Sequence, residues 1–207
     1  MFLRTLPDAA QNALAVLGKS KILDFAYMAG GTALALHLGH RSSVDFDFFS
    51  SQEFDEEEIK RKLELVGEYR IDEQRPRTML GYFDGVKFSL FWYRYPLIKE
   101  TVECLGVKLA SIEDIAAMKL AATLGRATKK DYIDVFFLLK RFGLEGMMKS
   151  YEQKFKNLES NKLALIKGMQ YFEDVDDSPM PVMFEEIDWD AAKEILRSEA
   201  KKYWGRL

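Results

Sequence analysis

Two aspartates separated by one residue are the first candidates for chemistry in this sequence. Asp45 and Asp47 lie in residues 44–49, where apolar and acidic residues alternate as in a half-buried strand. At positions i and i+2 of a strand, both carboxylates project from the same face, and two like charges this close favour a cation between them. The pair therefore predicts a divalent metal site; an acidic face turned to water is the alternative. The apolar positions expected in the core are Val44, Phe46 and Phe48.

A glycine pair upstream favours the metal-site interpretation over a solvent-exposed acidic face. Gly30, Gly31 and Thr32 follow the short apolar strand expected at residues 25–29 and begin an Ala- and Leu-rich helical segment. Glycines let the backbone approach a ligand, and the free amides at a helix start attract phosphate. The sequence thus places both halves of a triphosphate–metal site within residues 30–47.

Polar residues between these two halves are further candidates for binding. Arg41 and Ser43 could hold additional phosphate oxygens, although Arg41 could equally serve only to neutralise the aspartate pair. His37 and His40 are the only histidines, and neither cysteine nor further histidine stands at zinc-ligand spacing. We expect surface or capping roles for both histidines.

Charged side chains in the second half of the chain form another candidate group. On a helix beginning at Ile112, Lys119 and Arg126 share one stripe with Ala116 and Thr123. In the next helix, Asp131 and Asp134 lie together beside the core stripe, which consists of Tyr132, Val135, Phe136 and Leu139. A Lys–Asp ion pair joining the two helices is the alternative to a role in chemistry.

The elements that must position these residues indicate an α+β fold. Helical spacing is found at residues 8–23, with Asp8 as the expected N-cap, and at 53–66; Thr78–Phe83 and Val86–Trp92 flank an Asp84-Gly85 hairpin turn. We expect a small mixed sheet of about four or five strands. A helical C-terminal half follows, with helices expected at 112–125, 130–141, 145–156 and 160–172. An acidic loop is expected at 173–188. The last helix is amphipathic, and its apolar stripe consists of Trp189, Ala192, Leu196 and Tyr203. The expected division is a sheet domain at 1–108 and a helical region at 109–207.

The composition of the chain indicates its cellular compartment and the kinds of partner that it can bind. The chain of 207 residues has a single cysteine, Cys104, an N-terminus unlike a signal peptide, and no apolar run near the roughly twenty residues of a membrane span. We expect a soluble cytoplasmic protein that binds no membrane. Its net charge of −3 means that any contact with nucleic acid must use a local patch. The candidate patches are Lys60–Lys62, Arg75 with Arg77, and Arg126 with Lys129 and Lys130.

The run GGTALALHLGHRSSVDFDFF, residues 30–49, resembles the abortive-infection AbiEii/AbiGii-type toxins of the minimal nucleotidyltransferase superfamily, which shares its palm with DNA polymerase beta. Residues 108–139 also look like later motifs of that family, a helical lysine followed by an arginine and a Lys-Asp-x-x-Asp segment. The resemblance extends over about residues 26–140. It implies a nucleotidyltransferase palm in the first domain.

The resemblance also implies roles for individual residues. Gly30 and Gly31 would form the nucleotide-phosphate turn, and Asp45 and Asp47 would hold Mg²⁺ or Mn²⁺. Later catalytic or nucleotide-contacting positions would be Lys119 and Asp131. The substrate would be a nucleoside triphosphate, the acceptor an RNA 3′ end or a protein side chain, and the setting a toxin–antitoxin pair with an antitoxin protein as partner.

One position departs from the superfamily pattern. Many nucleotidyltransferases carry a third carboxylate on a neighbouring strand, but the matching strand here presents Lys87 and Ser89 on its polar face. Either the site holds one metal, or Lys87 replaces the charge of a cation beside the nucleotide. A module that binds nucleotide or a partner without chemistry is therefore one alternative function, and a metal-dependent phosphohydrolase is another.

Overall fold

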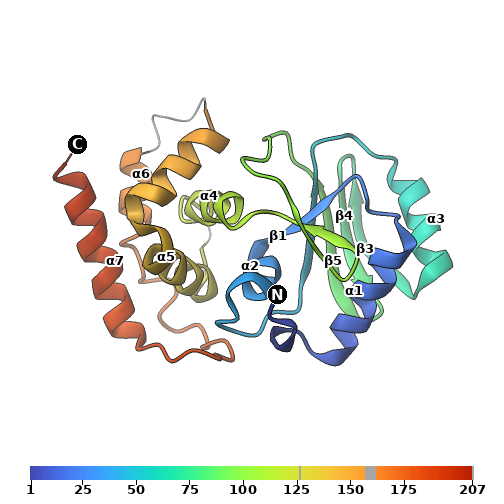
Figure 1. Ribbon diagram of the computed structural model, residues 1–207, viewed down its shortest axis with the longest axis horizontal. Coiled ribbons are helices and arrows are strands. Elements are labelled where there is room, and N and C mark those ends of the chain that lie inside the picture. Colours follow the sequence, from blue (N-terminus) through green and yellow to red (C-terminus); the bar gives the residue numbers. More distant parts are fainter. Residues whose placement is uncertain (126, 157–161, 207) are drawn as a thin grey trace. The chain divides into compact units, whose positions relative to one another are not determined.

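The computed structural model describes residues 1–125, 127–156 and 162–206. The chain forms two compact units, Met1–Ser111 and Ile112–Leu207 (Figure 1). The first contains the whole β-sheet, and the second is helical. This architecture confirms the predicted α+β class.

The first unit is built on a seven-stranded mixed sheet with the order β3-β4-β5-β2-β1-β7-β6. Its central strands β2 and β5 are parallel, whereas β1 and β2 are antiparallel. The strands are β1 (Tyr27–Ala29), β2 (Phe46–Ser50), β3 (Tyr69–Arg75), β4 (Thr78–Phe83), β5 (Val86–Trp92), β6 (Val102–Cys104) and β7 (Val107–Leu109). The expectation of four or five strands was too low, because β6 and β7 are only three residues long and β3 is largely polar.

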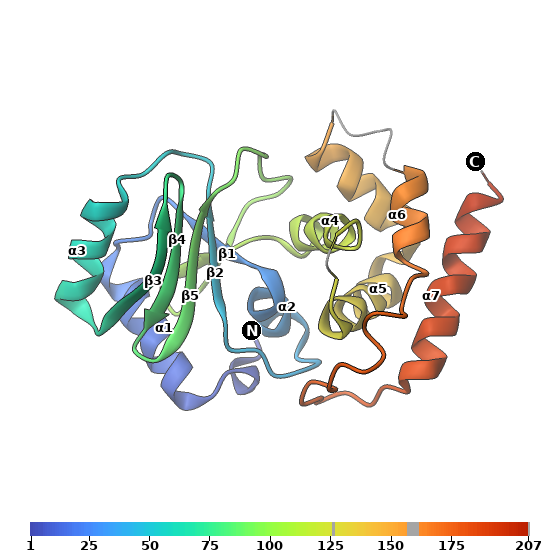
Figure 2. The same ribbon diagram turned by 180° about the vertical axis from the view of Figure 1, so that it is seen from behind.

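The first unit contains three α-helices, of which α1 and α3 lie on the same side of the sheet. After the short 3-10 helix η1 (Leu3–Thr5), the helices are α1 (Asp8–Ser20), α2 (Gly30–Leu38) and α3 (Glu56–Val66). Figures 1 and 2 show α1 and α3 on the same side, where Leu14 of α1 and Leu63 of α3 are fully buried. The predicted N-cap of α1 was wrong, since Pro7 occupies that position and Asp8 is the first helical residue.

The β4–β5 hairpin matches its sequence signature. Asp84 and Gly85 have φ values of 48° and 76°, so both central residues of the turn are left-handed, as a type I′ turn requires. The strands on either side, β4 and β5, have the predicted bounds. This turn fixes the register of β5, which lies directly beside β2.

The second unit consists of α4 (Ile112–Ala122), α5 (Lys129–Lys154), α6 (Lys162–Gly168) and α7 (Trp189–Trp204). Gly143, with φ 64°, kinks α5 between the two helices expected at 130–141 and 145–156. A fully buried ion pair joins Asp114 of α4 to Lys154 of α5 at 2.7 Å. Among the described residues, no helix is both long and apolar enough to cross a bilayer.

Candidate active site

The two aspartates lie at the beginning of β2. Asp47 is the second residue of β2, and Asp45 immediately precedes that strand; both are half-buried. Phe46 and Phe48, the neighbours of Asp47 in the strand, are at most 1% exposed on the opposite face. The expectation of a buried Val44 was wrong: it is 42% exposed, because it lies in the connection before β2, where strand alternation has not begun.

Asp47 lies against the start of α2. Its backbone pairs with Ala29 of β1, the residue immediately before that helix. Gly30 has φ +72°, and a β-carbon added there would stand 2.7 Å from Asp47 Oδ2. Any other residue would be strained by this φ and would also press on the carboxylate. Gly30 therefore lets the first turn of α2 and the Asp47 carboxylate approach each other closely.

Arg41 and Ser43 meet the next glycine. A β-carbon on Gly31 would stand 2.5 Å from Arg41 Nη2 and 3.3 Å from Ser43 Oγ. Thr32 Oγ1 donates a hydrogen bond of 2.9 Å to Ser43 Oγ, and Arg41 is only 2% exposed. The structure thus brings together the predicted residues Gly31, Thr32, Arg41 and Ser43 at one helix start.

This helix start is suited to an anion. The N-cap residue of α2, Ala29, makes no side-chain capping bond. The first amides of a helix have no partner within the helix and carry a partial positive charge, which attracts phosphate. The Arg41 guanidinium adds a full positive charge beside them.

The neighbouring strand β5 carries no acid beside the aspartates. Asp47 pairs in register with Ser89, which is 4% exposed, and Phe46 pairs with Phe88. In parallel pairs, residues in register point to the same face, so Lys87, an exposed residue two positions before Ser89, lies on the face of Asp47. Over the described ranges, no group of three His, Cys, Asp or Glu side chains could enclose a metal ion.

Lys119 is held between two aspartates of the second unit. Its Nζ lies 2.8 Å from Asp131 Oδ1 and 2.7 Å from Asp134 Oδ2, and its side chain is 9% exposed. Asp131 also accepts hydrogen bonds from the backbone amide and the hydroxyl of Thr128, at 2.9 and 2.8 Å, in a capping box at the start of α5. The predicted residues Lys119 and Asp131 are therefore in direct contact.

Charge pairing sets the ionisation of this cluster. Burial by itself lowers the pKa of Lys119, but the charges of Asp134 and Asp131 and their hydrogen bonds outweigh it, so the pKa is raised. Burial likewise favours the neutral form of Asp131, whereas the Lys119 charge and the Thr128 hydrogen bonds leave the pKa of Asp131 lowered. Lys119 and Asp131 therefore stabilise each other's charged forms.

The structure agrees with the sequence expectations at some of the remaining residues and differs at others. His37 Nε2 lies 2.9 Å from the carbonyl oxygen of Ala110, but His40 is fully buried, so a surface role was wrong for His40. Arg126, predicted to share a stripe with Lys119, lies outside the described residues, and α4 ends at Ala122. Cys104 is buried, and burial raises the pKa of its thiol.

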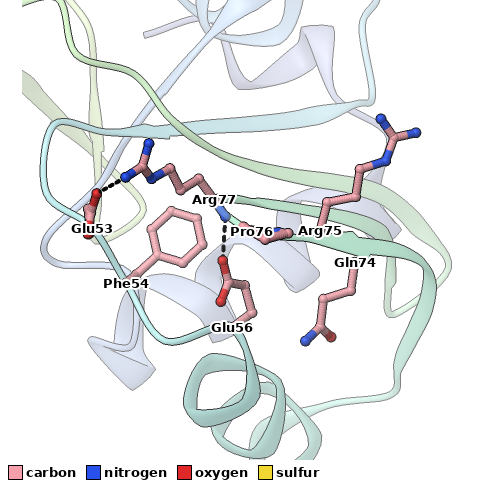
Figure 3. A pocket seen from close by; sticks show the side chains of 7 residues that line it. All are labelled: Glu53, Phe54, Glu56, Gln74, Arg75, Pro76 and Arg77. Carbon is pink, nitrogen blue, oxygen red and sulfur yellow. Dashed lines mark hydrogen bonds and ion pairs between the residues drawn. The ribbon is translucent and has the colours of Figure 1, made fainter.

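One basic patch predicted from the sequence lies in a hollow with matched charges. Arg77 forms an ion pair with Glu53 and lies 4.6 Å from the centre of the Trp92 ring. Figure 3 shows the Arg77 side chain extending toward Glu53 and the Arg77 backbone amide bonded to Glu56, with the Arg75 side chain pointing away. Arg75 pairs with Glu73. Each arginine thus has an acidic partner within the first unit, so this hollow offers little net positive charge to a phosphate.

Comparison with known sequences identifies the family. A family profile described as nucleotidyl transferase AbiEii toxin, type IV toxin–antitoxin system, matches residues 12–104 and 93–204. The chain belongs to the AbiEii nucleotidyltransferase toxin family. It is therefore a nucleotidyltransferase, as predicted from the glycine and aspartate motifs.

Relatives of this AbiEii protein agree with its length and fold. An uncharacterised protein of Aquifex aeolicus is 35% identical, over 97% of this chain and 98% of its own. Two solved structures share the fold at TM-scores of 0.60 and 0.57. The first, JHP933 from Helicobacter pylori, is 20% identical and the match covers 98% of this chain and 94% of JHP933. The second, the nucleotidyltransferase toxin MenT4 from Mycobacterium tuberculosis, is 15% identical and the match covers 94% of this chain and 86% of MenT4.

Asp134, which the sequence placed beside Asp131, is fully buried and is the second partner of Lys119, in an ion pair that joins the two helices. One feature of the AbiEii protein was not assigned from its sequence. Phe49 follows Asp47 at i+2 on β2, on the same face. That alternation could have identified an aromatic neighbour of the site.

Proposed function

We propose that this AbiEii nucleotidyltransferase transfers a nucleoside monophosphate from a nucleoside triphosphate to a hydroxyl acceptor, with Mg²⁺ or Mn²⁺ bound at Asp45 and Asp47. The observation that carries the proposal is the contact of Gly30 with the Asp47 carboxylate. It unites a phosphate-attracting helix start with a metal-binding type of side chain. The acceptor is an RNA 3′ end or a protein side chain.

The residues at the start of α2 would bind the triphosphate. The amides of Gly30, Gly31 and Thr32 would face phosphate oxygens, and Arg41 would add a charged donor. Ser43, whose hydroxyl accepts a hydrogen bond from Thr32, would help to hold the segment that carries Arg41. Lys87, exposed on the same sheet face, would offset the negative charge of the nucleotide.

The carboxylates of Asp45 and Asp47 fit a divalent ion that arrives bound to the nucleotide. Mg²⁺ is commonly held by one or two carboxylates together with substrate phosphates and water, so two aspartates are sufficient. When bound, such an ion would neutralise charge on the phosphate oxygens. The pair is too sparse to form a closed protein cage, because no third ligand group accompanies it in the described part of the chain.

In the proposed reaction, the acceptor hydroxyl oxygen bonds to the α-phosphorus. The bond from that phosphorus to the oxygen bridging to the β-phosphate breaks, pyrophosphate leaves, and the hydroxyl proton passes to solvent or to a carboxylate. Asp45 and Asp47 would position the reacting groups, and Arg41 would stabilise negative charge on the triphosphate. Lys119 and Asp131 are proposed to contribute to turnover on the basis of the family motif.

Labelled nucleotides test this function against its alternatives. The protein is incubated with total RNA and Mg²⁺, in parallel with α-labelled and γ-labelled nucleoside triphosphates. Transfer of the α-label to a macromolecule, with the γ-label recovered in pyrophosphate, supports the proposal. Free labelled phosphate would instead indicate a phosphohydrolase, and no turnover with retained nucleotide binding would indicate a binding module.

A partner protein is a separate part of the proposal. The family description names a toxin–antitoxin system, so we propose that an antitoxin limits this activity in the cell. Expression of the chain alone should slow growth, and Asp47→Asn should relieve that effect. Growth inhibition that persists in Asp47→Asn would contradict toxicity through nucleotidyl transfer.

A further inference from the structure

A row of aromatic rings continues the sheet face that bears Asp47. Phe49 lies two residues beyond Asp47 on β2, which is roughly 7 Å along a strand. Its ring centre lies 5.6 Å from that of Phe91 and 5.3 Å from that of Tyr93. Tyr93 in turn lies 5.1 Å from Tyr95. The rings therefore form a connected path leading away from the candidate active site.

These rings are not a closed core. Phe49, Phe91, Tyr93 and Tyr95 are all half-buried. The opposite face of the same two strands is different, because Phe48, Phe88 and Leu90 there are at most 1% exposed. Aromatic side chains that keep part of their surface accessible beside a reaction site can stack with a flat ligand.

A cavity of about 400 Å³ lies at the end of the row. Tyr95 lines it together with Tyr27, whose ring is stacked with that of Phe49 at 6.1 Å. The volume falls within the range of about 300–1,000 Å³ that is usual for small-ligand pockets. The aromatic row thus ends at a space large enough for a flat ring system.

Positive charge borders this cavity. The Arg94 guanidinium lies 5.3 Å from the centre of the Tyr95 ring, and Lys108 Nζ donates a hydrogen bond to the backbone carbonyl of Asp24 at 2.6 Å. Both cations line the cavity, where the Asp24 carboxylate is the acidic group. The chain as a whole carries a charge of −3, so this is a local reversal of charge. Aromatic faces beside cations are the usual means of holding an unpaired nucleic-acid strand.

We propose that the ring row and its cavity bind unpaired bases of a polynucleotide acceptor, so that the strand lies along Phe49, Tyr93 and Tyr95 with its reacting hydroxyl end at the aspartates. This assignment rests on the proposed nucleotidyl transfer and selects RNA over a protein side chain. A protein acceptor would place only a single hydroxyl at the aspartates, so its binding would not require a continuous row of aromatic rings. Each base has a π-face, so this row would bind RNA with little sequence preference.

Binding can be measured without turnover. The probe is a fluorescein-labelled single-stranded oligoadenylate of about ten nucleotides, a length typical for single-strand sites. Its fluorescence anisotropy is followed without nucleotide or divalent metal. Tyr93→Ala and Tyr95→Ala should each raise the Kd roughly 5- to 150-fold, whereas Tyr95→Phe should bind like wild type. The KM for the nucleoside triphosphate should stay unchanged.

Matched variants separate stacking from folding. Tyr95→Leu fills similar space without an aromatic face, so it should lose binding while its melting temperature stays near that of wild type. Trp204→Ala removes a ring that is 52% exposed at the end of α7, and it should leave the Kd unchanged. Asp47→Asn should lose transfer but keep binding to the probe.

The outcomes distinguish this inference from the proposed function. If wild type binds the probe and both tyrosine variants bind equally well, the ring row is not the site. Transfer of α-label to protein, without probe binding, would also overturn the inference but would leave nucleotidyl transfer intact. Ring-dependent binding without any transfer would support the inference and contradict the proposed function.

Discussion

Asp47 Oδ2 lies 2.7 Å from the point where a β-carbon on Gly30 would stand. The carboxylate of β2 and the first residue of α2 are therefore in contact because residue 30 has no side chain. The same residue has φ +72°, a conformation that costs other residues roughly 1–2 kcal/mol. Local backbone conformation and site geometry thus depend on one glycine.

Gly30→Ala should reduce turnover more than its loss of stability explains, because the new methyl group displaces the Asp47 carboxylate. The matched control is Gly85→Ala, since Gly85 has φ +76° but nothing within 4 Å of an added β-carbon. Both variants should lose roughly 1–2 kcal/mol of unfolding free energy from backbone strain. Only Gly30→Ala should also lose activity, and equal activity in the two variants would show that the contact with Asp47 does not matter.

Gly31→Val should weaken triphosphate binding much more than it lowers the melting temperature. The added side chain would occupy the place of Arg41 Nη2, 2.5 Å from the β-carbon position. Nucleotide affinity and thermal unfolding are measured for Gly31→Val, Arg41→Gln and the double variant. If Gly31→Val acts by displacing Arg41, the double variant should be no worse than Arg41→Gln. Parallel losses of affinity and stability would mark Gly31 as a structural turn.

Lys119→Ala should destabilise the helical unit, since it leaves Asp134 and Asp131 without their shared cation. Removing one partner of a buried ion pair costs about 3–5 kcal/mol. Lys154→Ala is the matched control, because Lys154 forms a second buried ion pair, with Asp114, in the same unit. Turnover is compared well below both melting temperatures, and Lys119→Arg tests whether charge alone is enough. A rate loss confined to Lys119 supports its catalytic role, whereas equal rates in the two alanine variants would leave it an ion pair between helices.

The pH dependence of stability should follow the same cluster. The lowered pKa of Asp131 contributes stability that is present above the ordinary aspartate value of about 3.9 and is lost as pH falls through the lowered pKa. The raised pKa of Lys119 contributes stability that is present below about 10.4 and is lost as pH rises through the raised pKa. The melting-temperature difference between wild type and Lys119→Met should thus be level from about pH 5 to 10 and shrink outside that range. A difference that changes steadily across this range would contradict the assignment.

Much of the site could be predicted from local sequence because its determinants are local. Gly30 and Gly31 signal a break between strand and helix, and the alternation in residues 46–49 indicates the sheet face that bears Asp47. The Asp84-Gly85 turn specified its hairpin for the same reason. Each of these features depends on neighbours within a few residues.

The missed features depend on partners distant in sequence. Strand β3 is largely polar and is recognisable only through its pairing with β4. His40 is buried although its sequence context is polar, and Asp134 is buried because Lys119 of another helix neutralises it. Tertiary neighbours override sequence pattern at such positions, so only the folded structure identifies them.

Replacing each aspartate by asparagine tests the proposed site most directly. Asp45→Asn and Asp47→Asn keep side-chain size and remove one negative charge, and Asp72→Asn, in an exposed ion pair with Arg70 on β3, is the control. The measurement is Mg²⁺-dependent transfer of α-labelled nucleotide, with thermal unfolding recorded on the same samples. We predict that both site variants lose on the order of a hundredfold or more in rate while they melt like wild type, and that Asp72→Asn stays active. Wild-type rates in both Asp45→Asn and Asp47→Asn would contradict the assignment of the site.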